Sequence, residues 1–298
     1  MRSSARKWTA GIVLVAALAP ATLAAQRPPL TPEQQERVRI RPLMDGLYLL
    51  PGFDGNQSGG NVLARVTGEG VIVVDDKFED SFEFITDQIR RVTSEPVRYV
   101  LNTHHHFDHA GSNADFLGVA EVISHANARA NIVRNGQPGP PRLVFTRETS
   151  VFLGGAEARM LHLGRGHTNG DAVVYFPDLR TVHTGDLLVW GDRLDGTALT
   201  PFWDVANGGS LVEWPATLTR LLELDFDTVI PGHGPVLSKE DIRAFRADLE
   251  TLIDRFRVAI AAGATRADIV SRIDASDLGW PLPEARVLDA YDELTATR

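Results

Sequence analysis

The sequence contains no cysteine among its 298 residues. This absence excludes disulfide bonds, thiolate metal ligands and a cysteine nucleophile, and it also excludes lipid attachment to a cysteine at a processed N-terminus. Any metal ligands must therefore come from other side chains, of which the nine histidines are the first candidates.

Basic residues are also in deficit, with 30 Lys and Arg against 39 Asp and Glu and a net charge of -9. An acidic chain without a basic patch repels nucleic acid, so no nucleic-acid partner is expected. We interpret the acidic balance as a solvated surface that aids solubility. With 43% hydrophobic and 23% charged residues, the composition is that of an ordinary globular protein with one large domain or two small ones.

Long apolar runs are lacking except near the N-terminus, at Ala10–Ala21. Basic residues precede this run and small residues follow it: Arg2, Arg6 and Lys7, then Thr22, Ala24 and Ala25. This pattern predicts a signal peptide over residues 1–25 and a periplasmic or secreted protein with a net charge of about -12 after cleavage. The run is too short to span a bilayer comfortably, so no stable membrane anchor is expected.

The rest of the chain alternates predicted strands and helices. A polar, proline-containing N-terminal extension covers residues 26–44, and a helical tail covers residues 263–298. Short apolar runs bounded by Gly, Asn or Asp predict strands at Gly46–Leu50, Asn61–Val66, Val71–Asp75, Val97–Leu101, Val122–Ser124, Ser150–Leu153, Ala158–Leu163, Ala172–Phe176 and Thr181–Thr184. Helices are predicted at Ser81–Val92, Leu211–Leu224 and Lys239–Ala262. The order suggests two similar halves, each a sheet with outer helices, joined by a loop at Gln137–Pro141.

The densest chemical signal is the run from Thr103 to His109, which directly follows the predicted strand Val97–Leu101. Residues two apart in an extended segment point to the same side, so His104 and His106 can reach one metal while His105 faces away. Asp108 and His109 follow at a turn and can face a second metal.

Further candidate ligands lie in three glycine-rich turns, each following a predicted strand. They are His167 after Gly166, Asp186 after Gly185, and His233 between Gly232 and Gly234. Glycine lets the backbone approach a metal closely and adopt unusual dihedral angles. Each of these turns alone is a weak signal, because an isolated Gly-His-Gly is more often only a turn.

Together the histidine run and the three turns give a sequence that resembles the metallo-β-lactamase superfamily over roughly residues 45–260. The resemblance implies an α+β fold, an αββα sandwich of two mixed β-sheets flanked by helices, in a domain over residues 45–262. It implies that a first metal is held by His104, His106 and His167, a second by Asp108, His109 and His233, and that Asp186 bridges them. Asp108 is also the candidate catalytic residue.

Imidazoles and a few carboxylates around an open position are typical of catalytic zinc, so two Zn²⁺ ions are the expected cofactors. A hydroxide held between two such ions is a strong nucleophile at neutral pH. Family members with a di-iron redox centre usually have glutamate where this chain has His106, which favours hydrolysis, although iron or manganese also suits these ligands.

Asp75, at the end of a predicted strand, matches the family aspartate that orients a metal ligand by a hydrogen bond without touching the metal. A cap at the end of the strand is an equal alternative. Phe53, Trp190, Phe202 and Trp203 lie near metal-bearing segments and are candidates for an apolar substrate wall, with core packing as the alternative for each. We interpret the remaining histidines, His105, His125, His162 and His183, as structural.

The expected function is hydrolysis of a small carbonyl compound, which could be a lactone, ester, thioester or β-lactam. Asp186 disfavours an established β-lactamase, because zinc β-lactamases have cysteine or serine there, whereas thioesterases and many lactonases and phosphodiesterases of the family have aspartate. Those with cysteine usually carry a lysine three residues later, and here Leu187 to Trp190 supply none. Metal-dependent phosphodiester hydrolysis and true β-lactamase activity are the alternatives, and a non-catalytic metal-binding protein is disfavoured because no ligand is missing.

Overall fold

A computed structural model describes residues 30–52, 57–193 and 196–296. The predicted signal peptide and Phe53 lie outside these described residues. Within them, no helix combines the length and the apolar character needed to cross a membrane.

The first sheet has seven strands in sequence order, antiparallel from β1 to β4 and parallel from β4 to β7. Its strands are β1 Arg41–Met44, β2 Leu47–Leu50, β3 Val62–Thr67, β4 Gly70–Val74, β5 Val97–Leu101, β6 Glu121–His125 and β7 Leu143–Phe145. The central strand β4 is buried throughout, because Val71 and Val73 face one apolar cluster while Ile72 and Val74 face another. A continuous apolar run of this kind is typical of a strand covered on both faces.

The second sheet has six strands in the order β13-β12-β11-β10-β9-β8, with β11 and β12 parallel and the other pairs antiparallel. Its strands are β8 Glu148–Leu153, β9 Ala156–Leu161, β10 Val173–Phe176, β11 Thr181–Val189, β12 Thr228–His233 and β13 Leu237–Ser238. Both sheets are therefore mixed.

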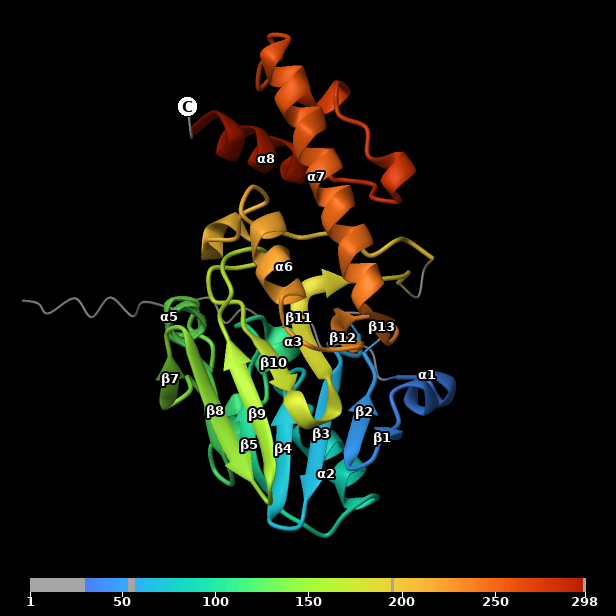
Figure 1. Ribbon diagram of the computed structural model, residues 1–298, viewed down its shortest axis with the longest axis vertical. Helices are drawn as coiled ribbons and strands as arrows, with labels where there is room; N and C mark the ends of the chain where they lie inside the picture. The colour runs from blue at the N-terminus through green and yellow to red at the C-terminus, as the bar shows by residue number, and fades with distance from the viewer. Residues whose placement is uncertain (1–29, 53–56, 194–195, 297–298) are drawn as a thin grey trace, which may run out of the picture.

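The two sheets pack face to face, and helices cover their outer faces (Figure 1). The helices are α1 Pro32–Arg37, α2 Phe82–Arg90, α3 Phe107–Ala110, α4 Asn113–Phe116, α5 Ala126–Arg134, α6 Trp214–Leu222, α7 Lys239–Ala261 and α8 Glu284–Ala296, with short 3-10 turns at Pro177–Leu179, Val205–Asn207, Ile269–Ser271 and Ser276–Leu278. Side chains of both sheets, such as Leu63 and Met160, share the inner core. Ile85 of α2 packs behind the first sheet, and Leu218 of α6 with Phe245 of α7 behind the second. This arrangement confirms the α+β, αββα sandwich.

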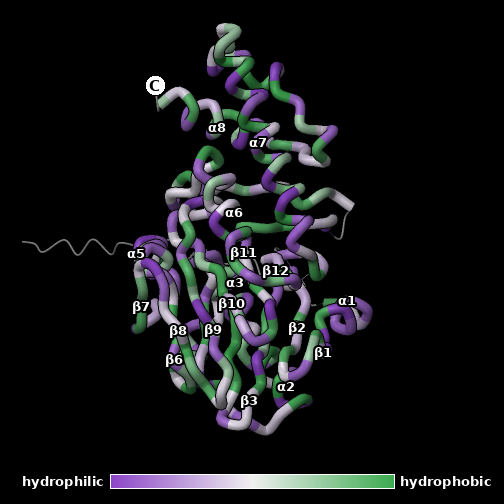
Figure 2. The backbone as a smooth tube through the Cα atoms, viewed as in Figure 1, coloured by the Kyte–Doolittle hydropathy of each residue, from purple (hydrophilic) through white to green (hydrophobic). Residues whose placement is uncertain are grey.

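The structure differs from the sequence expectations in the bounds and connections of several elements. β1 lies within the predicted N-terminal extension, so only α1 and its flanks lie outside the sheet, and α1 has no buried residue and is largely hydrophilic (Figure 2). The loop at Gln137–Pro141 precedes β7, and therefore does not separate the halves. The sequence analysis also missed β7 and α5 and gave no bounds for β12, because these elements are short or start within polar segments.

Candidate metal centre

The candidate ligands lie where the segments that follow β5 and β9 meet residues of β11 and β12. The backbone turns sharply after β4, and Asp75 has a positive φ of 60°. The carboxylate of Asp75 accepts hydrogen bonds from the backbone N–H of Thr103 (2.7 Å) and from its hydroxyl (2.8 Å). Asp75 thereby fixes the start of the histidine run.

His104, His106 and His167 form the first ligand group. Nε2 of His167 lies 2.8 Å from Nδ1 of His106, and Nε2 of His104 faces the same point. His106 starts α3 at its N-cap, while His167 lies in the turn before β10. Residues 61 positions apart in the sequence are therefore in contact.

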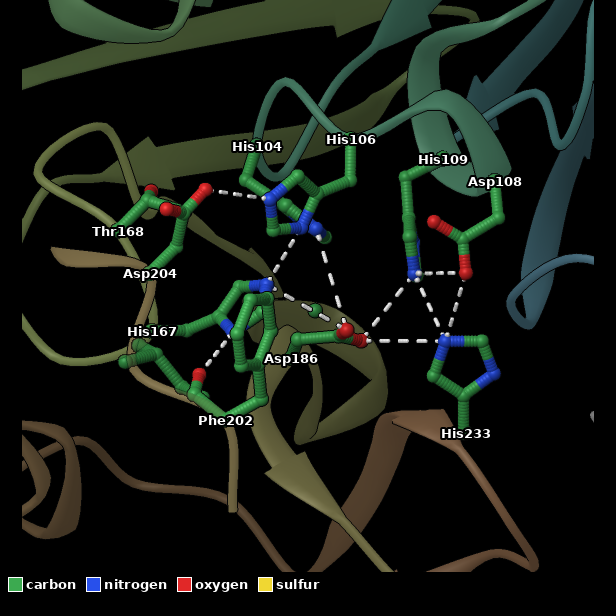
Figure 3. A network of polar contacts seen from close by, with 12 residues as sticks. His104, His106, Asp108, His109, His167, Thr168, Asp186, Phe202, Asp204 and His233 are labelled. Carbon is green, nitrogen blue, oxygen red and sulfur yellow. Dashed lines mark hydrogen bonds and ion pairs between the residues drawn. The ribbon is translucent and has the colours of Figure 1, made fainter. Parts of the chain in front are cut away.

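Asp108, His109 and His233 form the second ligand group. Nε2 of His233 lies 3.1 Å from Nε2 of His109 and 3.1 Å from a carboxylate oxygen of Asp108. Asp108 and His109 come from α3, and His233 ends β12. Their side chains converge beside the first group (Figure 3).

Asp186, on β11, lies between the two groups and directs one oxygen to each. Its Oδ1 is 3.1 Å from Nε2 of His109, whereas its Oδ2 is 3.5 Å from Nε2 of His167. Figure 3 shows this carboxylate between the two sets of rings. The structure thus brings together all seven residues predicted from the sequence as ligands.

Outer hydrogen bonds fix which nitrogen of each ring faces inward. Nδ1 of His167 contacts the carbonyl oxygen of Phe202 (2.5 Å), which can only accept, so this nitrogen carries the proton. Nε2 of His106 contacts Asp204 (3.0 Å), and Nδ1 of His109 contacts Asp75 (2.8 Å). A carboxylate also accepts, so each of these rings in its neutral form presents the lone pair of its inner nitrogen, as metal ligation requires.

Two of these outer partners, Phe202 and Asp204, were missed as such by the sequence analysis. Asp204 lies 98 residues beyond His106, and its short spacing to Asn207 indicates only a capped turn. No local signal in the sequence links either residue to a histidine. Asp75, in contrast, lies where the sequence analysis placed a ligand-orienting residue.

The donor set fits divalent cations. Among the described residues, the inward Nε2 of His104 and Oδ1 of Asp186 are buried without a hydrogen-bond partner, and the lone pairs of His106 and His167 face each other. Burial and neighbouring histidines lower the pKa of His104, and they lower that of His167 to about 4, so both rings are neutral at pH 7. Neutral imidazole and carboxylate are the ligands that zinc, iron and manganese take.

Electrostatics also favour a cation in the second group. Burial would raise the pKa of Asp108, but the charges of His109 and His233 outweigh it and lower that pKa to about 2. Burial opposes the charged form of His109, yet Asp186, Asp108 and Asp75 raise its pKa. The carboxylates thus create a negative field that a metal cation can compensate.

The structure places some candidate substrate residues in the core and one of them beside the ligands. Trp203 is 0% exposed and packs in the core behind the second sheet, so it does not form a substrate wall. Trp190 is partly buried against the same core. Phe202 is 38% exposed, and it borders the ligands together with Phe107.

A pocket of about 400 Å³ opens onto the ligands. Its described lining, apart from ligands, consists of Phe78, Phe107, Val189, Arg193, Leu199, Thr200 and Phe202. Such a volume suits a small molecule, and most of the lining is apolar. Arg193 is the only lysine or arginine among these described lining residues.

The histidines outside the ligand set have structural contacts. His183 lies 3.1 Å from the backbone oxygen of Asn61 and accepts a hydrogen bond from the N–H of Gly185. His125 stacks on His162 with ring centroids 4.0 Å apart. His105 is buried behind His106, and burial lowers its pKa to about 3.

Comparison with known proteins places this arrangement in a family. The family model described as "Metallo-beta-lactamase superfamily" matches residues 57–233, more than half of the chain. That range contains all seven candidate ligands, and it ends at His233.

Individual relatives are more distant. The chain is 29% identical over 225 residues to 2,4-dinitroanisole O-demethylase subunit alpha of Nocardioides sp. (strain JS1661), covering 72% of this chain and 60% of that protein, less than two thirds of its length. It is 28% identical over 167 residues to metallo-beta-lactamase type 2 of Elizabethkingia meningoseptica, covering 55% of this chain and 67% of that one. A metallo-beta-lactamase structure from Pontibacter korlensis superposes with a TM-score of 0.62 at 21% identity, covering 71% of this chain and 98% of that chain, which supports the fold.

Proposed function

Because the chain belongs to the metallo-β-lactamase superfamily and is a metal-dependent hydrolase, we propose that it is a dinuclear zinc enzyme. Its proposed substrate is a lactone, ester or thioester. The observation that carries the proposal is the position of Asp186. Its two carboxylate oxygens face separate ligand groups, at 3.1 Å from His109 and 3.5 Å from His167. A side chain in this position joins two sites into one centre.

When bound, two zinc ions supply Lewis acidity for the scissile carbonyl and activation of water. His104, His106 and His167 would hold one ion, and Asp108, His109 and His233 the other. The protein itself fixes the ring orientations through Asp204, Asp75 and the carbonyl of Phe202. Preorganised ligands of this kind need no rearrangement when substrate binds.

The pocket supports a small, partly apolar substrate. Phe107 and Phe202 form apolar surface beside the ligands, and Arg193 is the one basic residue among the described lining residues. No lysine occurs from Leu187 to Trp190, at the end of β11 and directly after it. A charge-assisted contact to a β-lactam carboxylate is worth roughly 1.5 to 3 kcal/mol, so β-lactam turnover should be weaker than that of uncharged lactones or esters.

Phosphodiester hydrolysis uses the same metal chemistry and is the second candidate. The net charge of -9 disfavours a nucleic acid substrate, and Arg193 alone gives little positive potential in the pocket. The proposed site of action is the periplasm or the exterior of the cell, on the strength of the basic, apolar and small-residue segments in residues 1–25.

A substrate panel on the zinc-loaded protein tests this proposal. The panel contains lactones, esters, thioesters, a penicillin, a carbapenem and a phosphodiester, and it includes 2,4-dinitroanisole because of the name of one relative. We expect kcat/KM for a lactone, ester or thioester to exceed that of every other class by at least about tenfold. A higher value for a β-lactam, phosphodiester or aryl ether would contradict the proposed substrate class.

A further inference from the structure

The C-terminal helix α8 lies beyond the part of the chain that the family model matches, and it lies beside α7 (Figure 1). Val287, Ala290 and Leu294 form a buried stripe on it, at the spacing of one helix face. They belong to the same apolar cluster as Trp203 and Phe245. The helix is therefore an integral part of the second outer layer.

A second face of α8 holds a loop that we call the anchor loop, residues 202–211. Near its start, Arg286 donates a hydrogen bond to the carbonyl of Trp203 (2.8 Å), and its guanidinium lies 4.4 Å from the ring centre of Phe202. Near its end, Glu293 accepts hydrogen bonds from the N–H of Leu211 (3.0 Å) and from the hydroxyl of Ser210. Seven residues make about two helical turns, so both contacts come from one side of α8.

The same loop supplies the outer contacts of two candidate ligands. The carbonyl of Phe202 accepts from Nδ1 of His167, and Asp204 accepts from Nε2 of His106. The loop also pairs with the backbone around His167, since the N–H of Asp204 donates to the carbonyl of His167 (2.8 Å) and the N–H of Ser210 to that of Gly166 (2.8 Å). The loop's position thus determines the orientation of both rings.

We propose that α8 is a positioning element for the first ligand group, and that Arg286 is its principal positioning residue. Arg286 contacts neither the ligands nor their inner nitrogens, and it acts through Phe202, Trp203 and Asp204. Its own geometry is fixed by an ion pair with Asp289 (2.8 Å) one turn along α8. This inference rests on the proposed dinuclear centre.

The consequence is selective. Without the Arg286 contacts, the start of the anchor loop becomes more mobile, and the outer partners of His106 and His167 lose their fixed positions. Loss of outer partners typically reduces metal affinity by 10- to 100-fold, so an indirect effect of about tenfold is expected for the first site. The second group takes its outer contact from Asp75 on the first sheet, and its affinity should not change.

The test uses the mature full-length chain with Arg286→Met, which keeps an apolar stem of similar length over Phe202 but removes the charge and the donor. Arg266→Met is the matched control, because Arg266 pairs with Asp292 of α8 but contacts no anchor-loop residue through that pair. Arg286→Lys restores a charged donor. Stepwise Zn²⁺ affinities are measured against a chelator, and amide hydrogen exchange is measured on the metal-free proteins.

In Arg286→Met we expect one of two Zn²⁺ affinities to fall about tenfold, with faster exchange at Asp204 and Ser210 in the metal-free chain. Arg286→Lys should recover part of both effects, and Arg266→Met should match wild type. Two unchanged affinities in Arg286→Met would overturn the inference and leave the dinuclear proposal intact. Equal weakening of both sites would also overturn it, because the role would then be general stability. Wild-type protein that binds fewer than two Zn²⁺ would overturn the proposed function, and this inference with it.

Discussion

The two ligand groups lie side by side but differ in what fixes the orientation of their side chains. In the second group, His109 is fixed from the first sheet, since Asp75, directly after β4, accepts a hydrogen bond from it. The first group draws the partners of His106 and His167 from a distant loop, at Asp204 and Phe202. His109 of the second group is thus fixed at the end of the first sheet, whereas the first group is completed by a loop that the C-terminal helix holds. This difference predicts that the groups respond differently to changes behind the ligands.

Asp186→Asn should have the largest effect, because Asp186 is the only candidate ligand that faces both groups among the described residues. The amide removes the negative charge and replaces one oxygen acceptor with a donor. Since the loss of an outer partner alone costs 10- to 100-fold, we expect more than a hundredfold loss of kcat/KM and a zinc content below two. Elemental analysis with steady-state kinetics measures both, and full activity in this variant would remove the bridging role.

Single-ligand variants separate the groups. His167→Ala and His233→Ala should each retain about one zinc and at most about one hundredth of the activity. The zinc that remains in His233→Ala should be bound more tightly than the zinc that remains in His167→Ala, because the first group keeps three rings with outer partners. In the second group, Nδ1 of His233 is buried without a hydrogen-bond partner in the described part of the chain. Chelator competition on both variants provides the measurement, and the reverse order of affinities would contradict the comparison.

The outer carboxylates give a subtler contrast. Asp204→Asn should weaken only the first metal site, by roughly 10- to 100-fold. Asp75→Asn should weaken the second directly and also disturb His104, because Asp75 contacts Thr103, whose hydroxyl lies 3.1 Å from Nδ1 of His104. Spectra of cobalt-substituted protein should show one altered site in the first variant and two in the other. The comparison fails if Asp204→Asn alters the second site, or if Asp75→Asn leaves the second site unchanged.

The smallest expected effect concerns pH and the loop that carries His167. His125 accepts from the N–H of Asn127 at the start of α5, and it stacks on His162, which contacts the carbonyl of Asp171. Burial and His162 lower the pKa of His125 to about 4. Its unfolded-state pKa is near 6.5, so the unfolded chain takes up a proton first and stability is lost as pH falls from about 6.5 towards 4.

Comparison with His125→Asn isolates this contribution, because asparagine can cap α5 but does not titrate. We expect wild type to lose on the order of 1 to 2 kcal/mol more than the variant between pH 7 and pH 5, after allowance for solvent screening. Urea unfolding at the two pH values checks this. Equal losses would show that His125 is not responsible.

The sequence was sufficient for the features that depend on local pattern. The strand Val71–Asp75 and the run from Thr103 to His109 are continuous segments, and the family resemblance placed Asp75 beside that run, where it contacts Thr103. The outer partners Phe202 and Asp204 were not predictable, because their contacts arise from tertiary packing between segments far apart in the chain. Trp203 illustrates the same limit, since its neighbours bracket the site while its own side chain turns into the core.

The central claim is that two metal ions act as one centre joined by Asp186. The most direct test prepares metal-free protein and adds Zn²⁺ in measured equivalents, following activity against the best substrate of the panel. The account predicts no activity without metal, full activity only as the second equivalent binds, and two zinc per chain by elemental analysis. Full activity at one equivalent, or in metal-free protein, would contradict it.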